Sequence, residues 1–97
     1  MPEYLLLMHD DTVTAEAVER WPAYLDGLGA RGALRGGSAI GDGITVRREG
    51  APAPQSLDIT GFIRVDAPDL QAARALLDGN PTYDAGGTIE IRELPLD

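Results

Sequence analysis

Residues 4–8 read Tyr4-Leu5-Leu6-Leu7-Met8, and this short apolar run decides the fold. It is closed by His9-Asp10-Asp11, so it is too short for a helix, and its apolar residues do not alternate with polar ones. A continuous run of this length predicts a strand that is buried on both of its faces.

A helix is predicted to follow this strand. Thr14 is expected to cap it, and Gly29 to Gly32 is expected to end it. Its apolar stripe, at helical spacing, consists of Val18, Trp21, Leu25 and Leu28. Pro22 lies inside this pattern and removes one backbone donor, which predicts a kink or a locally reset helix.

The middle of the chain predicts a hairpin. Residues 34–40 and 44–48 are apolar segments on either side of Gly41-Asp42-Gly43, and an Asp-Gly turn in such a place indicates a β-hairpin. Residues 49–56 contain Pro52 and Pro54 and are expected to form a loop.

The remaining chain predicts strand, helix and strand. Apolar and polar residues alternate over 57–65, which is typical of a half-buried strand. Asp66 and Pro68 are expected to start a second helix with the stripe Leu70, Ala73, Leu76 and Leu77. Gly79-Asn80-Pro81 is expected to stop it, and the alternation around Ile89 and Ile91 predicts the last strand.

The order of these elements is β-α-β-β-α-β, the ferredoxin-like α+β fold with an extra hairpin, as one domain over residues 1–97. Two helices cover only one face of such a sheet. Yet the first strand is apolar on both sides, and Phe62 points away from Ile63 and Val65. A second copy of the chain is the simplest cover for the other face, so we predict a homodimer.

Composition narrows the chemistry. The net charge of -8 disfavours nucleic acid and anionic membranes as partners, and no secretory or membrane-spanning pattern is present, which predicts a cytoplasmic protein. The sequence has no cysteine, no lysine and a single histidine. Thiolate sites, lysine Schiff bases and a three-histidine zinc site within one chain are therefore excluded. Any chemistry is expected to need no metal or cofactor and to use carboxylates, one imidazole, tyrosine or arginine.

The chain resembles the YCII-related, or DGPF-domain, family of small bacterial proteins. The residues that carry the resemblance are 4–10 (YLLLMHD), 21–25 (WPAYL), 32–37 (GALRGG), 61–63 (GFI) and 86–92 (GGTIEIR). It covers essentially the whole chain and implies a dimeric α+β barrel.

On function, the resemblance implies two directions. One branch of the family resembles a dehydrochlorinase of chlorinated hydroxyquinols, and other relatives are encoded beside sigma factors, which suggests an accessory role. In the catalytic branch an aspartate at the end of the first strand pairs with a histidine on the first helix. Here the aspartate corresponds to Asp10 and the helix position holds Tyr24, while Glu49-Gly50-Ala51-Pro52 stands in place of the Asp-Gly-Pro-Phe signature.

His9, Asp10 and Tyr24 are the candidate catalytic residues. His9 and Asp10 are able to exchange a proton at the strand end, and Tyr24 is able to polarise an oxygen. Neighbours on a strand point to opposite faces, so His9 and Asp10 serve one pocket only if the strand bends at residue 9. Otherwise His9 is an interface histidine, Asp10 belongs to the helix entry and Tyr24 lies at the rim of the core.

Trp21 and Ser38 are the candidate ligand-binding residues, although Trp21 also fits a core position. Gly36-Gly37 before Ser38 favours a bulge or a close backbone approach over a phosphate-binding loop, since no helix follows. Arg47-Arg48 suits an anionic ligand or a solvated strand edge.

Two functions remain open. The first is a cofactor-free lyase or isomerase that acts on a small oxygenated organic compound through Asp10, His9 and Tyr24. The second is a non-catalytic module that binds a small ligand or assists a regulator.

Overall fold

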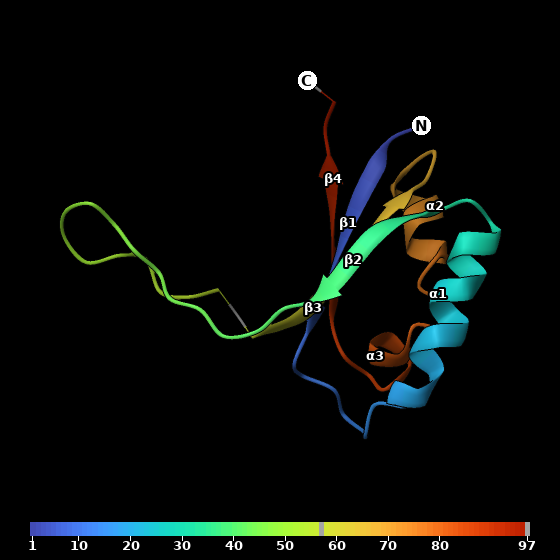
Figure 1. The fold of residues 1–97 in the computed structure, drawn as a ribbon, viewed down its shortest axis with the longest axis horizontal. Coiled ribbons are helices and arrows are strands. Elements are labelled where there is room, and N and C mark those ends of the chain that lie inside the picture. The colour runs from blue at the N-terminus through green and yellow to red at the C-terminus, as the bar shows by residue number, and fades with distance from the viewer. Residues whose placement is uncertain (57, 97) are drawn as a thin grey trace.

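The structure, a computed structural model, describes residues 1–56 and 58–96. It is a small α+β domain in which helices pack on one face of a four-stranded antiparallel sheet (Figure 1). The elements are β1 (Glu3–His9), the 3-10 turn η1 (Val18–Arg20), α1 (Trp21–Ala30), β2 (Leu34–Ala39), β3 (Ile59–Asp66), α2 (Leu70–Ala75), α3 (Pro81–Asp84) and β4 (Ile89–Leu94).

The sheet has the order β2-β3-β1-β4, with β1 and β3 in the centre. The predicted succession of strand, helix, two strands, helix and strand is confirmed, and α3 is an addition. The predicted strand around residues 57–65 begins at Ile59, and Leu57 lies outside the described residues. No helix in the described part of the chain is long and apolar enough to cross a membrane.

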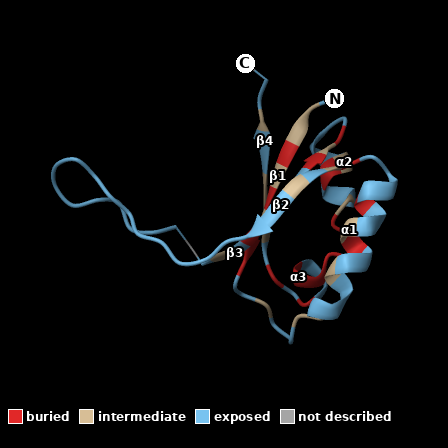
Figure 2. Cartoon of the chain, viewed as in Figure 1, coloured by how far each residue is buried: buried red, intermediate tan, exposed pale blue. Residues whose placement is uncertain are grey.

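The core lies between the helices and one face of the sheet. Tyr4, Leu6 and Met8 of β1 are buried there together with Ile63 and Val65 of β3. Figure 2 shows buried segments alternating with half-buried ones along β1, and helices on one side of the sheet. Neighbouring residues point to opposite faces, so Leu5 and Leu7 lie on the second face, away from the helices. We call this second face of the sheet the open face.

The first helix begins later than predicted. Thr14 does not cap it: the Thr14 hydroxyl and backbone N–H both bond the carbonyl of Ala85. Val18 is 64% exposed in η1, and α1 starts at Trp21. Pro22 therefore occupies the first turn, where its missing N–H has no partner to lose, and it does not kink the helix.

The predicted hairpin is only half formed. Residues 34–39 form β2, but residues 44–48 form no strand, and Ile44 is 86% exposed. Residues 41–56, which we call the arm, extend away from the sheet on the side opposite to α1 (Figure 1). The radius of gyration is 14.7 Å, against about 13 Å for a compact domain of this length.

Two further helix ends differ from the prediction. The second helix begins at Leu70 rather than after Asp66, because the side chain of Asp69 accepts the N–H of Ala72 and caps it. Asn80 does not merely stop a helix: its side chain accepts the N–H of Tyr83 and starts α3, with Pro81 in the first turn.

Candidate functional site

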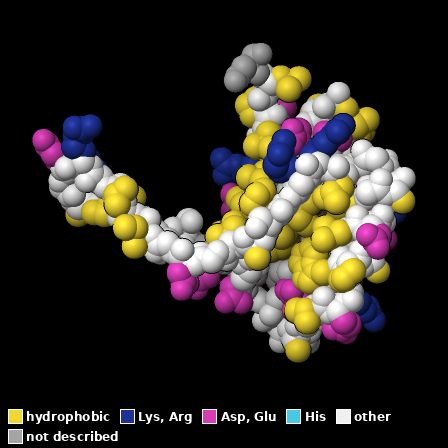
Figure 3. Space-filling view, viewed as in Figure 1, with side chains coloured by type: hydrophobic (Ala, Val, Ile, Leu, Met, Phe, Trp, Pro, Cys, Tyr) yellow, Lys and Arg dark blue, Asp and Glu magenta, His cyan; other side chains and the backbone are white. Residues whose placement is uncertain are grey.

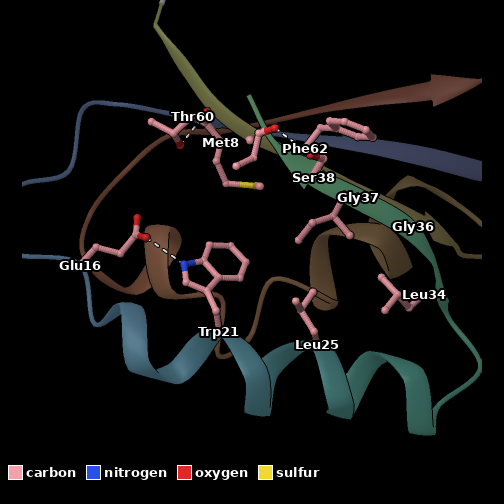
Figure 4. Close-up of a pocket in the computed structure, with 13 residues that line it drawn as sticks. Met8, Glu16, Trp21, Leu25, Leu34, Gly36, Gly37, Ser38, Thr60 and Phe62 are labelled. Atoms are coloured by element: carbon pink, nitrogen blue, oxygen red, sulfur yellow. Dashed lines mark hydrogen bonds between the residues drawn. The ribbon is translucent and has the colours of Figure 1, made fainter. Parts of the chain in front are cut away.

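A hollow with a volume of about 610 Å³ lies between α1 and the β2–β3 side of the sheet. We call it the α1 pocket (Figure 4). Its lining is mostly apolar or glycine: Met8, Trp21, Leu25, Leu34, Gly36, Gly37, Ala39, Gly61, Phe62 and Ile63, with the polar residues Glu16, Ser38 and Thr60. Figure 3 shows hydrophobic side chains gathered between β2 and α1.

Glycines on β2 and β3 keep this hollow open. The predicted irregularity at Gly36-Gly37 is confirmed, since the β2–β3 register shifts between Leu34 and Gly36. A Cβ added at Gly37 would lie 2.6 Å from the carbonyl oxygen of Phe62, so this position accepts no side chain without a backbone shift. The sheet therefore presents backbone where a larger residue would fill the space in front of Trp21.

Trp21 stands at the N-terminus of α1 and forms one wall of the pocket. Its ring meets that of Tyr24 edge to face, with centroids 5.8 Å apart. Its Nε1–H donates to Oε2 of Glu16 at 2.8 Å, and the hydroxyl of Thr82 donates to Oε1 of the same carboxylate at 2.6 Å. Glu16 thus ties the first helix to α3 at one end of the pocket.

Ser38 lies at the rim. It pairs with Phe62 across the β2–β3 register, and its hydroxyl donates to the carbonyl oxygen of Ala39 at 2.8 Å. Trp21 and Ser38, the two predicted ligand-binding residues, both belong to the lining of this pocket. The Ser38 side chain, however, lies on the open face with that of its register partner Phe62, on the other side of the sheet from Trp21. The binding roles of Trp21 and Ser38 stay predictions.

Tyr24 has a different setting. It is buried, and its hydroxyl donates to the carbonyl oxygen of Leu76 at 2.7 Å. Burial raises the pKa of this phenol above its ordinary value of 10. The hydroxyl proton is therefore used in a hydrogen bond that joins α1 to the segment after α2. The Tyr24 side chain does not line the α1 pocket.

His9 belongs to the open face. Its Nε2 lies 3.3 Å from Oε1 of Glu90, and Glu90 faces away from Ile89 and Ile91, which pack on the core. The β1–β3 register shifts between Met8 and His9, so the bend that would bring His9 and Asp10 together has a local basis. Even so, His9 lies on the opposite side of the sheet from Tyr24.

Asp10 is exposed, and its backbone N–H donates to the carbonyl of Asp58. In the described part of the chain, no hydrogen bond joins any two of His9, Asp10 and Tyr24. The structure does not gather these three predicted catalytic residues around one hollow, and their catalytic roles remain predictions.

Two carboxylates with partners far away in the sequence were not found from the sequence pattern. Glu16 follows Thr14, the predicted helix cap, by two residues, whereas its partner Thr82 is 66 residues away. Asp11 accepts the backbone N–H and the hydroxyl of Thr88, 77 residues away, at 2.7 and 2.6 Å. No local motif signals pairings of this range.

Arg47 and Arg48 lie on the arm rather than on a strand edge. Both are exposed, and Arg47 donates to the carbonyl of Ala51 at the tip of the arm. In the described residues no group of histidine, aspartate and glutamate side chains has the geometry to hold a metal ion.

The fold and the pocket define a small α+β domain with a ligand-sized apolar hollow beneath its first helix. The family model of the YCII-related domain matches residues 3–95, and the chain belongs to this family. The predicted resemblance is thereby confirmed. A search of the curated proteins found no match to the chain.

Proposed function

We propose that this protein binds one small, largely apolar organic molecule in the α1 pocket of each subunit of a homodimer. The observation that carries the proposal is the pocket itself. Its volume of about 610 Å³ falls within the range of known ligand sites, and its walls are apolar with a few polar groups. Burial of a ligand's apolar surface there supplies the binding energy.

Subunit pairing is supported by the open face. Leu5, Leu7 and Phe62 are half-buried on that face and form its apolar centre. The Glu3–Arg64 and Glu90–Arg92 ion pairs lie beside them. An apolar centre with a charged rim is typical of a protein interface.

The binding test uses the single tryptophan of the chain. N-phenyl-1-naphthylamine, a neutral apolar dye, is titrated into the protein while Trp21 fluorescence and dye emission are recorded. We expect saturable binding at one site per subunit, with energy transfer from Trp21. Leu25→Gln, which makes one wall polar, is expected to weaken binding about tenfold.

Leu70→Gln is the matched control. Leu70 is 52% exposed on α2 and does not line the pocket, so this variant should bind the dye like the wild type. A dye signal that does not saturate, or equal weakening by both substitutions, would contradict the proposal.

A second candidate function is the cofactor-free lyase or isomerase. Its support is the largely buried imidazole of His9 beside the Glu90 carboxylate, next to Asp10 in the chain. Such a pair is suited to proton transfer. Turnover of a small oxygenated compound in metal-free buffer, abolished by Asp10→Asn in folded protein, would favour this candidate over simple binding.

A further inference from the structure

The hydrogen-bonding groups of the α1 pocket are unevenly divided between donors and acceptors. Among the described residues of its lining, Glu16 is the charged one. Trp21, Ser38 and Thr60 carry a side-chain N–H or O–H donor, but the Ser38 hydroxyl lies on the open face with the side chain of Phe62. Figure 4 shows Glu16 and the Trp21 indole at the same end of the pocket, joined by their hydrogen bond.

Each of these side-chain donors already has an acceptor within the protein. The indole N–H donates to Glu16 at 2.8 Å, and the hydroxyl of Ser38 donates to the Ala39 carbonyl at 2.8 Å. The hydroxyl of Thr60 donates to the carbonyl of Met8 at 3.4 Å. The lining side chains are therefore left with oxygen lone pairs to offer a ligand.

The carboxylate of Glu16 holds the strongest of these acceptors. A carboxylate accepts about four hydrogen bonds, and Trp21 and Thr82 supply two. Both partners are neutral, and the ion pairs found in the described residues involve other carboxylates. Within the part of the chain that the structure describes, the negative charge of Glu16 therefore has no cationic partner, and it stands at the end of an apolar hollow.

We infer that the α1 pocket selects a ligand with an apolar body and one hydrogen-bond donor that reaches Glu16. The donor is a hydroxyl or an amine, and the ligand is neutral or cationic. A carboxylate or phosphate in the same place finds no side-chain donor and meets the Glu16 charge, within a chain of net charge -8. This inference rests on the proposed binding function and adds the chemical class of its ligand.

The test compares three probes of nearly equal size by displacement of N-phenyl-1-naphthylamine at pH 7.5: 4-ethylphenol, 4-ethylanisole and 4-ethylbenzoate. The phenol donates a hydrogen bond, the anisole only accepts one, and the benzoate is an anion. We expect the phenol to bind about tenfold more tightly than the anisole, since its bond goes to a charged acceptor. The benzoate is expected to bind at least about tenfold more weakly than the anisole, because its buried carboxylate finds no side-chain donor and is repelled by Glu16.

Glu16→Gln separates the effect of the Glu16 charge on the choice of ligand from the effect of the apolar walls of the pocket. The glutamine oxygen still accepts the Trp21 indole N–H, while its amide places a donor where the carboxylate had none. The preference for the phenol should fall to about threefold or less, and the benzoate should gain affinity. Glu19→Gln removes the same charge from an exposed residue of η1 outside the pocket, and it should leave the order of the three probes unchanged.

The outcomes distinguish the two proposals. If the dye and all three probes fail to bind, the binding function and its ligand class both fall. If the probes bind with equal affinity in the wild type, or the benzoate binds most tightly, the ligand class is wrong and the binding function stands. If the Trp21 indole NMR signal shows that Glu16→Gln does not fold, the order of affinity of the three probes for the wild type decides whether the ligand class is correct.

Discussion

Asp11 fastens the loop after β1 to the loop before β4. Its carboxylate accepts the backbone N–H and the hydroxyl of Thr88, and these bonds lower the pKa of Asp11 below its ordinary value. The hydroxyl bond is the largest cause. Because β1 and β4 are hydrogen-bonded neighbours, this contact closes the end of the sheet next to His9.

We expect Asp11→Asn to destabilise the protein at neutral pH and to do so less in acid. The folded-state pKa is depressed, so the carboxylate stabilises the fold above its unfolded-state pKa, about 3.9, and loses this effect as the pH falls through the folded-state value. Urea unfolding at pH 7 and in steps from pH 4.5 to 2.5 measures the free energy of unfolding. The difference between wild type and variant should shrink over the acid steps.

Asp10→Asn serves as the control for Asp11. It removes the neighbouring exposed carboxylate, and Asp10 contributes its backbone N–H rather than its side chain to the contact with Asp58. A difference in stability between wild type and Asp11→Asn that is constant from pH 7 to pH 2.5 would show that the Thr88 contact is not tied to the charge.

At the scale of single residues, the sequence predicted those features that depend on the pattern of neighbouring residues. Trp21 and Ser38 were singled out because each belongs to a recognisable segment, an apolar helical stripe and a glycine-rich strand. Both belong to the lining of the pocket, and their binding roles stay predictions. Thr82 and Thr88, the partners of Glu16 and Asp11, were not predicted. A hydrogen bond between residues 66 or 77 positions apart produces no local pattern in the sequence.

At the scale of elements, the four strands of the sheet were predicted because apolar runs and alternation directly reflect a two-faced sheet. The strand predicted over residues 44–48 was wrong. Helix starts were predicted poorly. Thr14 has the chemistry of a cap, but the backbone N–H groups of Val13 and Thr14 bond the Ala85 carbonyl, and no helix begins there. Asn80-Pro81 has the chemistry of a helix start and was interpreted as a stop, since Gly79 precedes it.

The arm is an element without packing of its own. Ile44 and Val46 are 86% and 81% exposed, and residues 41–56 extend on the same side of the sheet as the open face (Figure 1). Exposed branched apolar side chains on a projecting segment favour contact with another surface. A second copy on the open face would lie within reach of the arm.

We therefore expect the double variant Ile44→Ser/Val46→Ser to weaken the dimer while the fold of each subunit is kept. Loss of two apolar contacts should raise the dimer dissociation constant about tenfold or more. Sedimentation velocity over a concentration series measures this constant, and circular dichroism checks the fold. The exposed Leu70→Ser on α2 is the control, and an unchanged constant in the double variant would exclude the arm from the interface.

At the scale of the whole molecule, the sheet separates two surfaces. The helices and the arm lie on opposite sides of the sheet (Figure 1). The α1 pocket is on the helical side, and Leu7 and His9 are on the open face. Pairing of two copies through the open face would leave each α1 pocket on the outer, helical side of its own subunit. Ligand binding and assembly are therefore expected to respond to different substitutions.

Leu7→Glu tests this separation. Leu7 pairs with Phe62 on β3 and with Glu90 on β4, so the variant places a negative charge in the apolar centre of the open face and beside another carboxylate. We expect wild type at micromolar concentration to have twice the 10.3 kDa mass of the chain in light scattering, and Leu7→Glu to have the mass of one chain. The variant should still bind N-phenyl-1-naphthylamine, because Leu7 points away from the pocket.

Leu70→Glu, on the helical side, should remain dimeric. A wild-type mass of 10.3 kDa would refute the dimer, and loss of dye binding in a folded Leu7→Glu monomer would mean that the pocket depends on the second copy.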